Sequence, residues 1–533
     1  MSTHPLLGTR HLVRLALRRD RIVMPVWILL LGTIPAAVAG TYGELYRTEA
    51  ERQSLTTGMA ANPSLSLLYG PPFDLSDAGG FTVWRYGTII PLFLAMACVF
   101  TVTKHTRQEE DTGRQELLSS AVLGRFAALT AAVVTGALTA FGTGLLTVVA
   151  LAGAGVPTSG AVAFGAAIAL TGLVFTGVAA ITAQLAEYAR TANGLAMAVL
   201  GVAFLLRAVG DAAKDVGWLS WLSPIGWSTQ VRPFAGERWW VLGLLLGTAI
   251  ATGAIAYVLS TRRDVGLGLL PARPGPATAA PGLRTPLALA WRLHRGSFAG
   301  WTIAFAVMGA LFGSLAAGIG DVVGESQATA EIFERMGGAD KIVDAFLGTL
   351  GQVFAIIASM YGVQAALRMR SEEVAVRVEP LLATRVGRLR WTAGHLLFAL
   401  LGSAVMMAVA GVMAGLLHGL RVSDLANQVP SVLGATMAQL PAVWVVLAVT
   451  VLLFGLLPKY TTVAWAVAGV FVTLSLFGPV LQLSQPVLNL SPFTHIPKLP
   501  GAEFTATPLV WLTGIAVVVF GAGLIGFRRR DIG

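Results

Sequence analysis

RQEEDTGRQELLSSAVLGR, from Arg107 to Arg125, returns 263 residues later as RSEEVAVRVEPLLATRVGR, from Arg370 to Arg388. Both stretches keep the pattern R-x-E-E-x-x-x-R-x-E-x-L and end in Gly-Arg. Other landmarks recur in the same order: Leu-Ser-Pro at 222–224 returns at 490–492, and Arg-Arg-Asp at 262–264 returns at 529–531. A period of about 265 residues is far longer than that of a solenoid repeat. The sequence therefore predicts one unit duplicated head to tail.

The composition indicates where these two halves lie. With 55% hydrophobic and only 12% charged residues, the chain is too apolar for a soluble protein of 533 residues. A transmembrane helix needs about 20 mostly apolar residues, and the first half offers such stretches at 22–42, 87–104, 126–152, 160–186, 192–210 and 239–260. The second half offers them at 299–319, 350–367, 392–417, 433–457, 461–482 and 508–527. The predicted fold is an all-α polytopic membrane protein whose twelve transmembrane helices form two tandem six-helix repeats.

The distribution of charge predicts the orientation. Most of the 37 Lys and Arg residues fall on one side of the predicted spans, and most of the acids fall on the other. Cytoplasmic loops carry the excess of Lys and Arg, so both termini are predicted to be cytoplasmic. Two transmembrane domains are predicted at 1–266 and 287–533, joined at 267–286 by an extended linker rich in Pro, Gly and Ala. Because the basic residues occupy short loops rather than one folded face, nucleic-acid binding is not expected.

The first 40 residues have the basic start and apolar run of a secretory signal. Residues 295–318 repeat this segment in mid-chain, so we expect the first copy to remain as a membrane span rather than to be cleaved. The single cysteine, Cys98, lies in a predicted span, which excludes an internal disulfide and a multi-cysteine metal site.

The repeated charged segment follows the second predicted span of each half and is predicted to form a short cytoplasmic amphipathic helix. Glu110 with Arg114, and Glu373 with Arg377, have the i, i+4 spacing of helical ion pairs. A solvated loop without a further role is the simpler interpretation. An idle loop, however, has no reason to keep its acids at a fixed spacing in both halves, so a functional role is also open.

The segment resembles the coupling helix in permeases of ATP-binding-cassette exporters of the second type, the ABC-2 family. The duplicated layout is similar to the actinobacterial subgroup that exports polyketide antibiotics and includes tetronasin-resistance permeases. The resemblance implies that a separate ATPase is contacted by Glu109, Glu110, Arg114, Glu116, Leu117, Leu118 and Arg125, and by Glu372, Glu373, Arg377, Glu379, Leu381, Leu382 and Arg388. The two copies depart from each other at Gly113, which is replaced by Val376, and at Leu117, which is replaced by Pro380. The two segments are therefore expected to engage the ATPase unequally.

The resemblance also implies the energy source and the partners. The sequence contains no G-x-x-x-x-G-K-[ST] phosphate-binding loop. ATP and Mg²⁺ are therefore expected on a separate nucleotide-binding subunit, present in two copies because there are two segments. The chain itself is expected to be a transport subunit without catalytic residues, cofactor or metal. Its expected role is to export a hydrophobic or amphipathic compound, such as a polyketide antibiotic or a lipid-like molecule, across the bacterial plasma membrane, in contact with membrane lipid.

Two further groups are candidates for the transport pathway. In the resembled family the Leu-Ser-Pro element dips back between the fifth and sixth spans, which suggests an outer gate formed by Leu222, Ser223, Pro224, Leu490, Ser491 and Pro492. The tryptophans around the first element are typical of an interfacial aromatic belt. Adaptable apolar side chains suggest a substrate cavity at Phe354, Met360, Tyr361, Met406 and Met407. Ordinary helix packing is the simpler interpretation of these five residues.

Two other functional classes fit parts of the sequence. A proton-coupled twelve-span efflux carrier usually has a membrane-embedded acid, and no Asp or Glu falls within the twelve predicted spans. An intramembrane peptidase is suggested by Glu-Glu-x-x-x-Arg and by His105 at i, i+4 from Glu109. The F-x-x-x-H and H-x-x-x-N spacings that this chemistry uses do not occur. The ATP-driven exporter is therefore favoured, and the proton-coupled carrier is the alternative.

Overall fold

The computed structural model describes residues 4–49, 51–53, 55, 63–115, 123–212, 214–264, 266–270, 277–324, 339–476 and 484–531. Regular structure in this part of the chain is entirely helical. The chain divides into two units, Met1–Pro274 and Gly275–Gly533, and their boundary falls within the predicted linker at 267–286. Each unit has its own hydrophobic interior, as expected for a duplicated domain.

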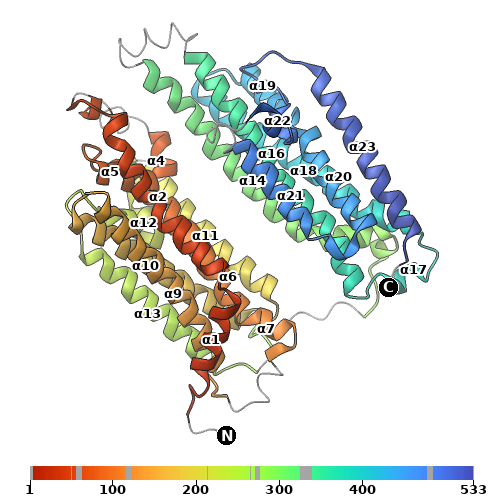
Figure 1. Cartoon of the computed structure of the whole chain (residues 1–533), viewed down its shortest axis with the longest axis horizontal. Coiled ribbons are helices and arrows are strands. Elements are labelled where there is room, and N and C mark those ends of the chain that lie inside the picture. Colours follow the sequence, from red (N-terminus) through yellow and green to blue (C-terminus); the bar gives the residue numbers. More distant parts are fainter. Residues whose placement is uncertain are drawn as a thin grey trace. The chain divides into compact units, whose positions relative to one another are not determined.

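The first unit is a bundle of long apolar helices with shorter helices at its two ends (Figure 1). The long helices are α2 (Val23–Leu45), α6 (Ile89–Lys104), α9 (Ala127–Gly153), α10 (Thr158–Leu185), α11 (Ala189–Ala212) and α13 (Trp240–Ser260). The short ones are α1 (Thr9–Arg19), α4 (Pro63–Tyr69), α5 (Ala78–Tyr86), α7 (Arg107–Asp111), the 3-10 helix η1 (Lys214–Leu222) and α12 (Pro224–Gln230). Helices α1 and α7 lie at one end of this bundle, and α4 and α5 lie at the other.

The second unit repeats this plan (Figure 1). Its longer helices are α14 (Pro286–Gly324), α16 (Ala339–Val374), α18 (Arg388–Arg421), α19 (Leu425–Met437), α20 (Leu440–Leu456), α21 (Val463–Leu476) and α23 (Ala506–Arg529). Its short helices are η2 (Pro281–Leu283), α17 (Glu379–Leu382), η3 (Pro458–Tyr460), α22 (Gln485–Leu488) and η4 (Pro492–Thr494). Helix α17 and the C-terminus lie at one end of the unit, and α22 lies at the other.

Eleven helical stretches of the described chain are long and apolar enough to cross a membrane, six in the first unit and five in the second. All eleven coincide with predicted spans. The remaining prediction, at 461–482, corresponds to the shorter apolar helix α21, and residues 477–483 lie outside the described part. The polytopic all-α prediction is confirmed, whereas the count of twelve spans and the orientation of the termini stay predictions.

The duplication predicted from the sequence is repeated in the burial of the spans. In the most apolar stretch of each of the first four spans, the fraction of residues that are buried is 22, 61, 44 and 72%, in chain order, in the first unit. The first four candidate spans of the second unit have the same four values in the same order. The last span of each unit is 17% buried. The fourth span is therefore central in both units, and the first and last spans are peripheral.

Proline explains one difference between the two central spans. Helix α10 runs unbroken from Thr158 to Leu185, whereas its counterpart is divided into α19 and α20. Pro430 lies inside α19 and Pro441 lies in the first turn of α20. Because proline lacks an N–H and clashes with the preceding turn, it favours a helix start and disturbs a helix interior.

The first residues of the predicted linker belong to the first unit. The N–H groups of Leu269 and Leu270 donate to the carbonyls of Gln184 and Leu185 at the end of α10, at 3.0 and 2.9 Å. The carbonyl of Leu267 accepts a hydrogen bond from Arg107 at 2.9 Å. The prediction of an unstructured connection is therefore wrong for 267–270, because these backbone groups are paired with the bundle.

Candidate functional site

The two Glu-Glu pairs end a helix at the same place in both units. In the first unit the backbone leaves helical geometry at Thr106 and then forms one turn, α7. In the second unit the equivalent residues form the end of α16, which stays helical through Val374. The predicted short amphipathic helix is not continuous over the described part of the segment, because each helix ends directly after its glutamates.

The second glutamate of each pair binds an arginine that follows the last span. Glu110 accepts from both terminal nitrogens of Arg263, at 2.6 and 2.9 Å. Glu373 accepts from Arg530 with both carboxylate oxygens, at 2.7 and 2.8 Å. These four side chains are 7 to 13% exposed, and charge-assisted bonds between such groups are the strong class of hydrogen bond. In each unit, the end of the second span is thereby tied to the end of the last span.

The first glutamate of each pair binds an arginine five residues further on. Glu109 lies 3.6 Å from Arg114, and Glu372 lies 3.5 Å from Arg377. The predicted i, i+4 pairs of these arginines with the second glutamate are wrong, because the helix does not continue to the arginine. The two glutamate side chains are 8 and 9% exposed, whereas the arginines are 53 and 65% exposed. Each pair therefore joins a buried acid to a base at the surface.

A residue with left-handed backbone ends the helix in both copies. Gly113 has φ +71° and Val376 has φ +57°. The N–H of Val376 donates to the carbonyl of Glu373 at 2.9 Å, and the N–H of Arg377 donates to that of Glu372 at 3.0 Å, the two bonds of a Schellman motif. Glycine adopts this backbone freely, whereas a β-branched residue is strained by about 1–2 kcal/mol. The replacement of glycine by valine thus changes the strain of the turn and keeps its left-handed backbone.

The arginine at the end of each repeated segment binds the last span a second time. Arg125 donates to the carbonyl of Thr261 at 2.7 Å. Arg388 donates to the carbonyls of Arg528 and Arg530 at 3.2 and 2.6 Å. The last carbonyls of a helix have no partner within it, so a guanidinium there satisfies them and complements the helix dipole.

The two units differ in what binds the first glutamate. Glu109 pairs at 2.8 Å with Arg19, the last residue of α1, which is 90 residues earlier in the chain. Glu372 instead pairs at 2.8 Å with Arg368, one turn earlier on its own helix. In the first unit, therefore, the charged segment is joined to the N-terminal helix.

Asp20, directly after α1, strengthens that connection. Its carboxylate pairs with Lys104 and, at 2.6 Å, with Nε2 of His105. Burial raises the pKa of the Asp20 carboxyl, but the bonds to His105 and Lys104 outweigh burial and hold the pKa below its ordinary value. Because His105 and Glu109 are both occupied by such partners, the partial metal site considered for a peptidase is an ion-pair cluster.

The rest of the predicted contact segment is only partly described. Three predicted residues lie outside the described part of the chain: Glu116, Leu117 and Leu118. In the second unit Glu379 is exposed at the start of α17, while Leu381 and Leu382 pack half-buried against the core. Pro380 lies in the first turn of α17, where a missing N–H needs no partner, so it begins this helix.

The Leu-Ser-Pro elements are bound to the fifth helix of each unit by their serines. Ser223 donates to the carbonyl of Ala203 in α11 at 2.6 Å and accepts the N–H of Gly226 at 3.2 Å, which caps α12. Ser491 donates at 3.4 Å to the carbonyl of Phe471 in α21. The serines are therefore anchors, since both are fully buried.

The residues beside these serines differ from them in exposure. Pro224 and Pro492 lie in the first turn of a short helix. Leu222 and Leu490 are 57 and 66% exposed. If the elements gate an exit, the leucines are the side chains free to meet a passing compound, and that role stays a prediction.

The five residues predicted for a substrate cavity pack within the second unit. Its hydrophobic core includes Phe354, Tyr361, Met406 and Met407, and Met360 is half-buried against that core. This packing accounts for their apolar side chains. A role for them in a transport pathway stays a prediction.

Several arginines of these clusters were missed by reasoning from the sequence, among them Arg19, Arg263, Arg368 and Arg530. Arg263 and Arg530 belong to the repeated Arg-Arg-Asp, and that repetition is the signal that could have assigned them to the site. Arg19 has no such signal, because the second unit has no equivalent contact among its described residues.

A buried acid lies directly after the predicted fifth span of the first unit. Helix α11 extends past the predicted end of the fifth span and includes Asp211, 3.4 Å from the buried Arg207. Arg207 also donates to the carbonyls of Ser66 and Leu68 at 3.1 and 2.9 Å, and Ser220 donates to Asp211 at 2.6 Å. Asp211 is therefore a buried and paired acid that directly follows the predicted span at 192–210, which itself contains no Asp or Glu.

Two comparisons with known proteins bear on this arrangement. Residues 283–528 match the family described as "Multidrug efflux system permease Rv1217c, C-terminal domain". The whole chain is similar to the multidrug efflux system permease protein Rv1217c of Mycobacterium tuberculosis (strain ATCC 25618 / H37Rv), with 45% identity over 527 residues. The alignment covers 98% of this chain and 95% of that protein.

Proposed function

The chain belongs to the family of multidrug efflux system permeases, and from that premise we propose that it is the membrane subunit of an ATP-driven exporter of the ABC-2 type. It is a multi-pass integral membrane protein, in bacteria of the plasma membrane, and a transport subunit. The proposal adds an energy source, ATP hydrolysis on a separate polypeptide, and a cargo, a hydrophobic or amphipathic compound such as an antibiotic.

The observation that carries the proposal is the repeated ion-pair cluster. Glu110 with Arg263, and Glu373 with Arg530, bind the end of the second span to the end of the last span. A protein that pushes on the charged segment moves both spans together, because buried bidentate contacts resist separation. Two such clusters in one chain suit a motor with two like subunits whose closure changes the arrangement of the spans.

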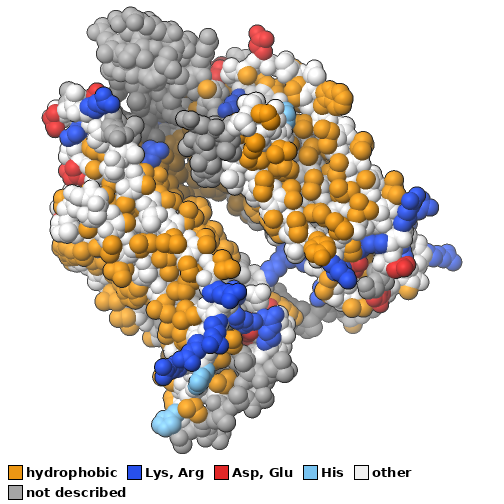
Figure 2. Space-filling model, viewed as in Figure 1, with side chains coloured by type: hydrophobic (Ala, Val, Ile, Leu, Met, Phe, Trp, Pro, Cys, Tyr) orange, Lys and Arg blue, Asp and Glu red, His pale blue; other side chains and the backbone are white. Residues whose placement is uncertain are grey.

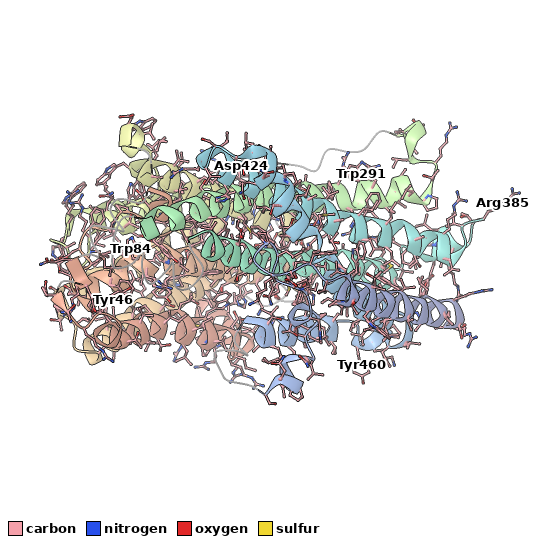
Figure 3. The ribbon with its side chains drawn as sticks, turned by 90° about the horizontal axis from the view of Figure 1, so that it is seen from above. Tyr46, Trp84, Trp291, Arg385, Asp424 and Tyr460 are labelled. Atoms are coloured by element: carbon pink, nitrogen blue, oxygen red, sulfur yellow. The ribbon has the colours of Figure 1, made fainter. Side chains whose placement is uncertain are left out.

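Exposed charges beside the clusters supply a surface for the ATPase. Arg114 and Arg377 are more than half exposed, and Glu379 is exposed at the start of α17. Arg385, between α17 and α18, projects away from the bundle (Figure 3). We assign one ATPase subunit to each segment, with ATP and Mg²⁺ bound on those subunits. The turn strained by Val376 makes the second docking surface different from the first.

The orientation follows from the docking surfaces, since ATP is cytoplasmic. The charged segments and both termini are then cytoplasmic, in agreement with the excess of Lys and Arg on that side. The Leu-Ser-Pro elements are at the outer end. Cargo taken from the inner leaflet and released outside would be apolar or amphipathic, because a membrane span offers mostly apolar contacts.

One observation favours the proton-coupled alternative. Asp211 is a buried acid within α11, and intramembrane acids often carry protons in transporters. Its carboxylate is held by Arg207 and Ser220, so protonation would cost an ion pair. This argues for a structural acid and against a proton carrier, and ATP remains the favoured energy source.

Inside-out membrane vesicles test the energy source. The permease is expressed with and without a co-encoded nucleotide-binding protein, and uptake of a fluorescent hydrophobic dye is followed with ATP or with an imposed pH gradient. Uptake that needs both ATP and the second protein, and that survives a protonophore, supports the proposal. Uptake driven by the pH gradient in the permease alone would favour the proton-coupled carrier.

A further inference from the structure

Helix α1 carries an unpaired basic stripe. Arg10, Arg14 and Arg18 recur every fourth residue, so they lie along one face of the helix, and all three are exposed. The opposite face packs on α9, with Ala16 fully buried. Figure 2 shows basic side chains gathered over this end of the first unit. Helix α1 is therefore amphipathic, with its apolar face already used.

The stripe has no counter-charge in the described chain. Helix α1 contains no Asp or Glu, and no ion pair or hydrogen bond from these three guanidinium groups occurs among the described residues. Arg19, on another face, is by contrast paired with Glu109. Three aligned guanidinium groups that have no partner among the described residues suit an anionic ligand.

The position of α1 identifies that ligand. Only Asp20, Arg21 and Ile22 separate α1 from α2, a candidate membrane span. Three residues allow about 10 Å of extended chain at most, so the C-terminal end of α1, with Arg18, is held near the depth of the lipid head groups. Leu15 and Ile22 beside the stripe are 38 and 67% exposed, as expected for a helix seated in the membrane interface.

We propose that the Arg10, Arg14 and Arg18 stripe of α1 binds the phosphodiester groups of anionic phospholipids. Guanidinium groups bind phosphate oxygens with two parallel hydrogen bonds, and zwitterionic lipids offer no net charge to neutralise the stripe. The lipid surface is favoured over an acidic protein because the short connection to α2 holds the stripe at the head groups.

The C-terminal end of α1 connects the lipid-binding stripe to the charged segment of the first unit. Arg19 pairs with Glu109, and Asp20 pairs with Lys104 and His105. Lipid that fixes α1 therefore fixes the cluster of the first unit. In the second unit Arg368 takes the place of Arg19, so that cluster is independent of α1. Lipid binding itself does not depend on which energy source drives transport.

The experiment uses the full chain purified in a neutral detergent and titrated with either phosphatidylglycerol or phosphatidylcholine. A rise in the thermal unfolding temperature reports the binding of each lipid. The wild type is expected to gain stability from phosphatidylglycerol at a concentration about tenfold lower than from phosphatidylcholine, since each basic residue near the surface favours anionic lipid. The R10Q/R14Q/R18Q variant is expected to lose this preference, and R10K/R14K/R18K is expected to keep part of it.

A matched control removes three exposed arginines from the start of the second unit. R284Q/R292Q/R295Q changes the net charge equally and sits beside a membrane span as well. It is expected to keep most of the tenfold preference, because Arg284 precedes α14 and the three arginines do not form one aligned stripe. Equal losses in both triple variants, or no lipid preference in the wild type, would overturn the proposal. So would a stripe variant that keeps its lipid preference but no longer binds the ATPase, because the stripe would then be a protein contact.

A control for folding completes the design. All variants are compared in phosphatidylcholine, where an unchanged unfolding temperature shows that the apolar face of α1 is still packed. If the triple variant fails this control, R14Q alone is used, and it is expected to weaken the preference about twofold, which is one third of the free energy of a tenfold preference. A preference equal to that of the wild type in R14Q would then contradict the proposal.

Discussion

Arg530 donates from one guanidinium nitrogen to both carboxylate oxygens of Glu373, at 2.7 and 2.8 Å. The same guanidinium lies over the rings of Phe454 and Phe527, 4.8 and 5.2 Å from their centroids. The end of the last span is thereby held against the end of the second. In the first unit Arg263 holds Glu110 with both of its terminal nitrogens, without such ring contacts among its described neighbours.

Replacement of Arg530 by lysine tests the planar geometry of this contact. Lys keeps the charge but loses the planar guanidinium that lies over the two rings, so R530K is expected to lower stability by about 1–2 kcal/mol. The neighbouring R529K is the matched control, because Arg529 is exposed and its side chain has no partner among the described residues. Thermal unfolding in detergent measures both. Equal unfolding temperatures would contradict the role given to Arg530.

Substitutions in the left-handed turn after the glutamates are expected to change the stability of the protein in opposite directions in the two units. Val376→Gly removes the strain of φ +57° and is expected to stabilise the protein by about 1 kcal/mol. Gly113→Val introduces that strain and is expected to cost about 1–2 kcal/mol. A side chain at 113 would meet no atom within 4 Å, so crowding does not confuse the result. Gly113→Asn, which tolerates this backbone, is the control and should change little.

The serine of the first Leu-Ser-Pro element is expected to matter for stability and its leucine for transport. Ser223→Ala loses a helix cap and a buried hydrogen bond, a cost of about 1–2 kcal/mol. Leu222→Ala, at a site 57% exposed, should leave the unfolding temperature nearly unchanged. If the element gates exit, Leu222→Ala changes the export rate of a fluorescent substrate. Unchanged export would exclude the gate.

The buried acid of α11 is expected to serve structure. Asp211→Asn leaves Arg207 buried without a counter-charge, which is expected to cost about 3–5 kcal/mol. R207M/D211L removes both charges and is expected to recover much of that loss. ATP-driven export should persist in the double variant. Loss of all export from a folded double variant would instead indicate that Asp211 carries protons.

The spans could be predicted from the sequence because hydropathy needs only a long apolar run. The ends of the helices could not, because α11 continues past the predicted end at 210, where Asp211 pairs with Arg207. Within the site, the repeat identified the glutamates, but the i, i+4 spacing predicted the wrong arginine partners for Glu110 and Glu373. The left-handed turn at Gly113 redirects the chain before Arg114, and Glu110 pairs instead with Arg107 and with Arg263, which is 153 residues away.

In the proposed mechanism, the Glu110–Arg263 and Glu373–Arg530 clusters transmit the motion of the ATPase to the membrane spans. Proteoliposomes with the permease and its candidate ATPase allow transport and ATP hydrolysis to be measured together for E110Q, E373Q and E110Q/E373Q, with Glu379→Gln as an exposed control. Each single variant is expected to lower the amount exported per ATP. The double variant is expected to hydrolyse ATP with export reduced at least about tenfold, as expected when a buried charge pair is broken. Export per ATP equal to that of the wild type in a folded double variant would contradict this mechanism.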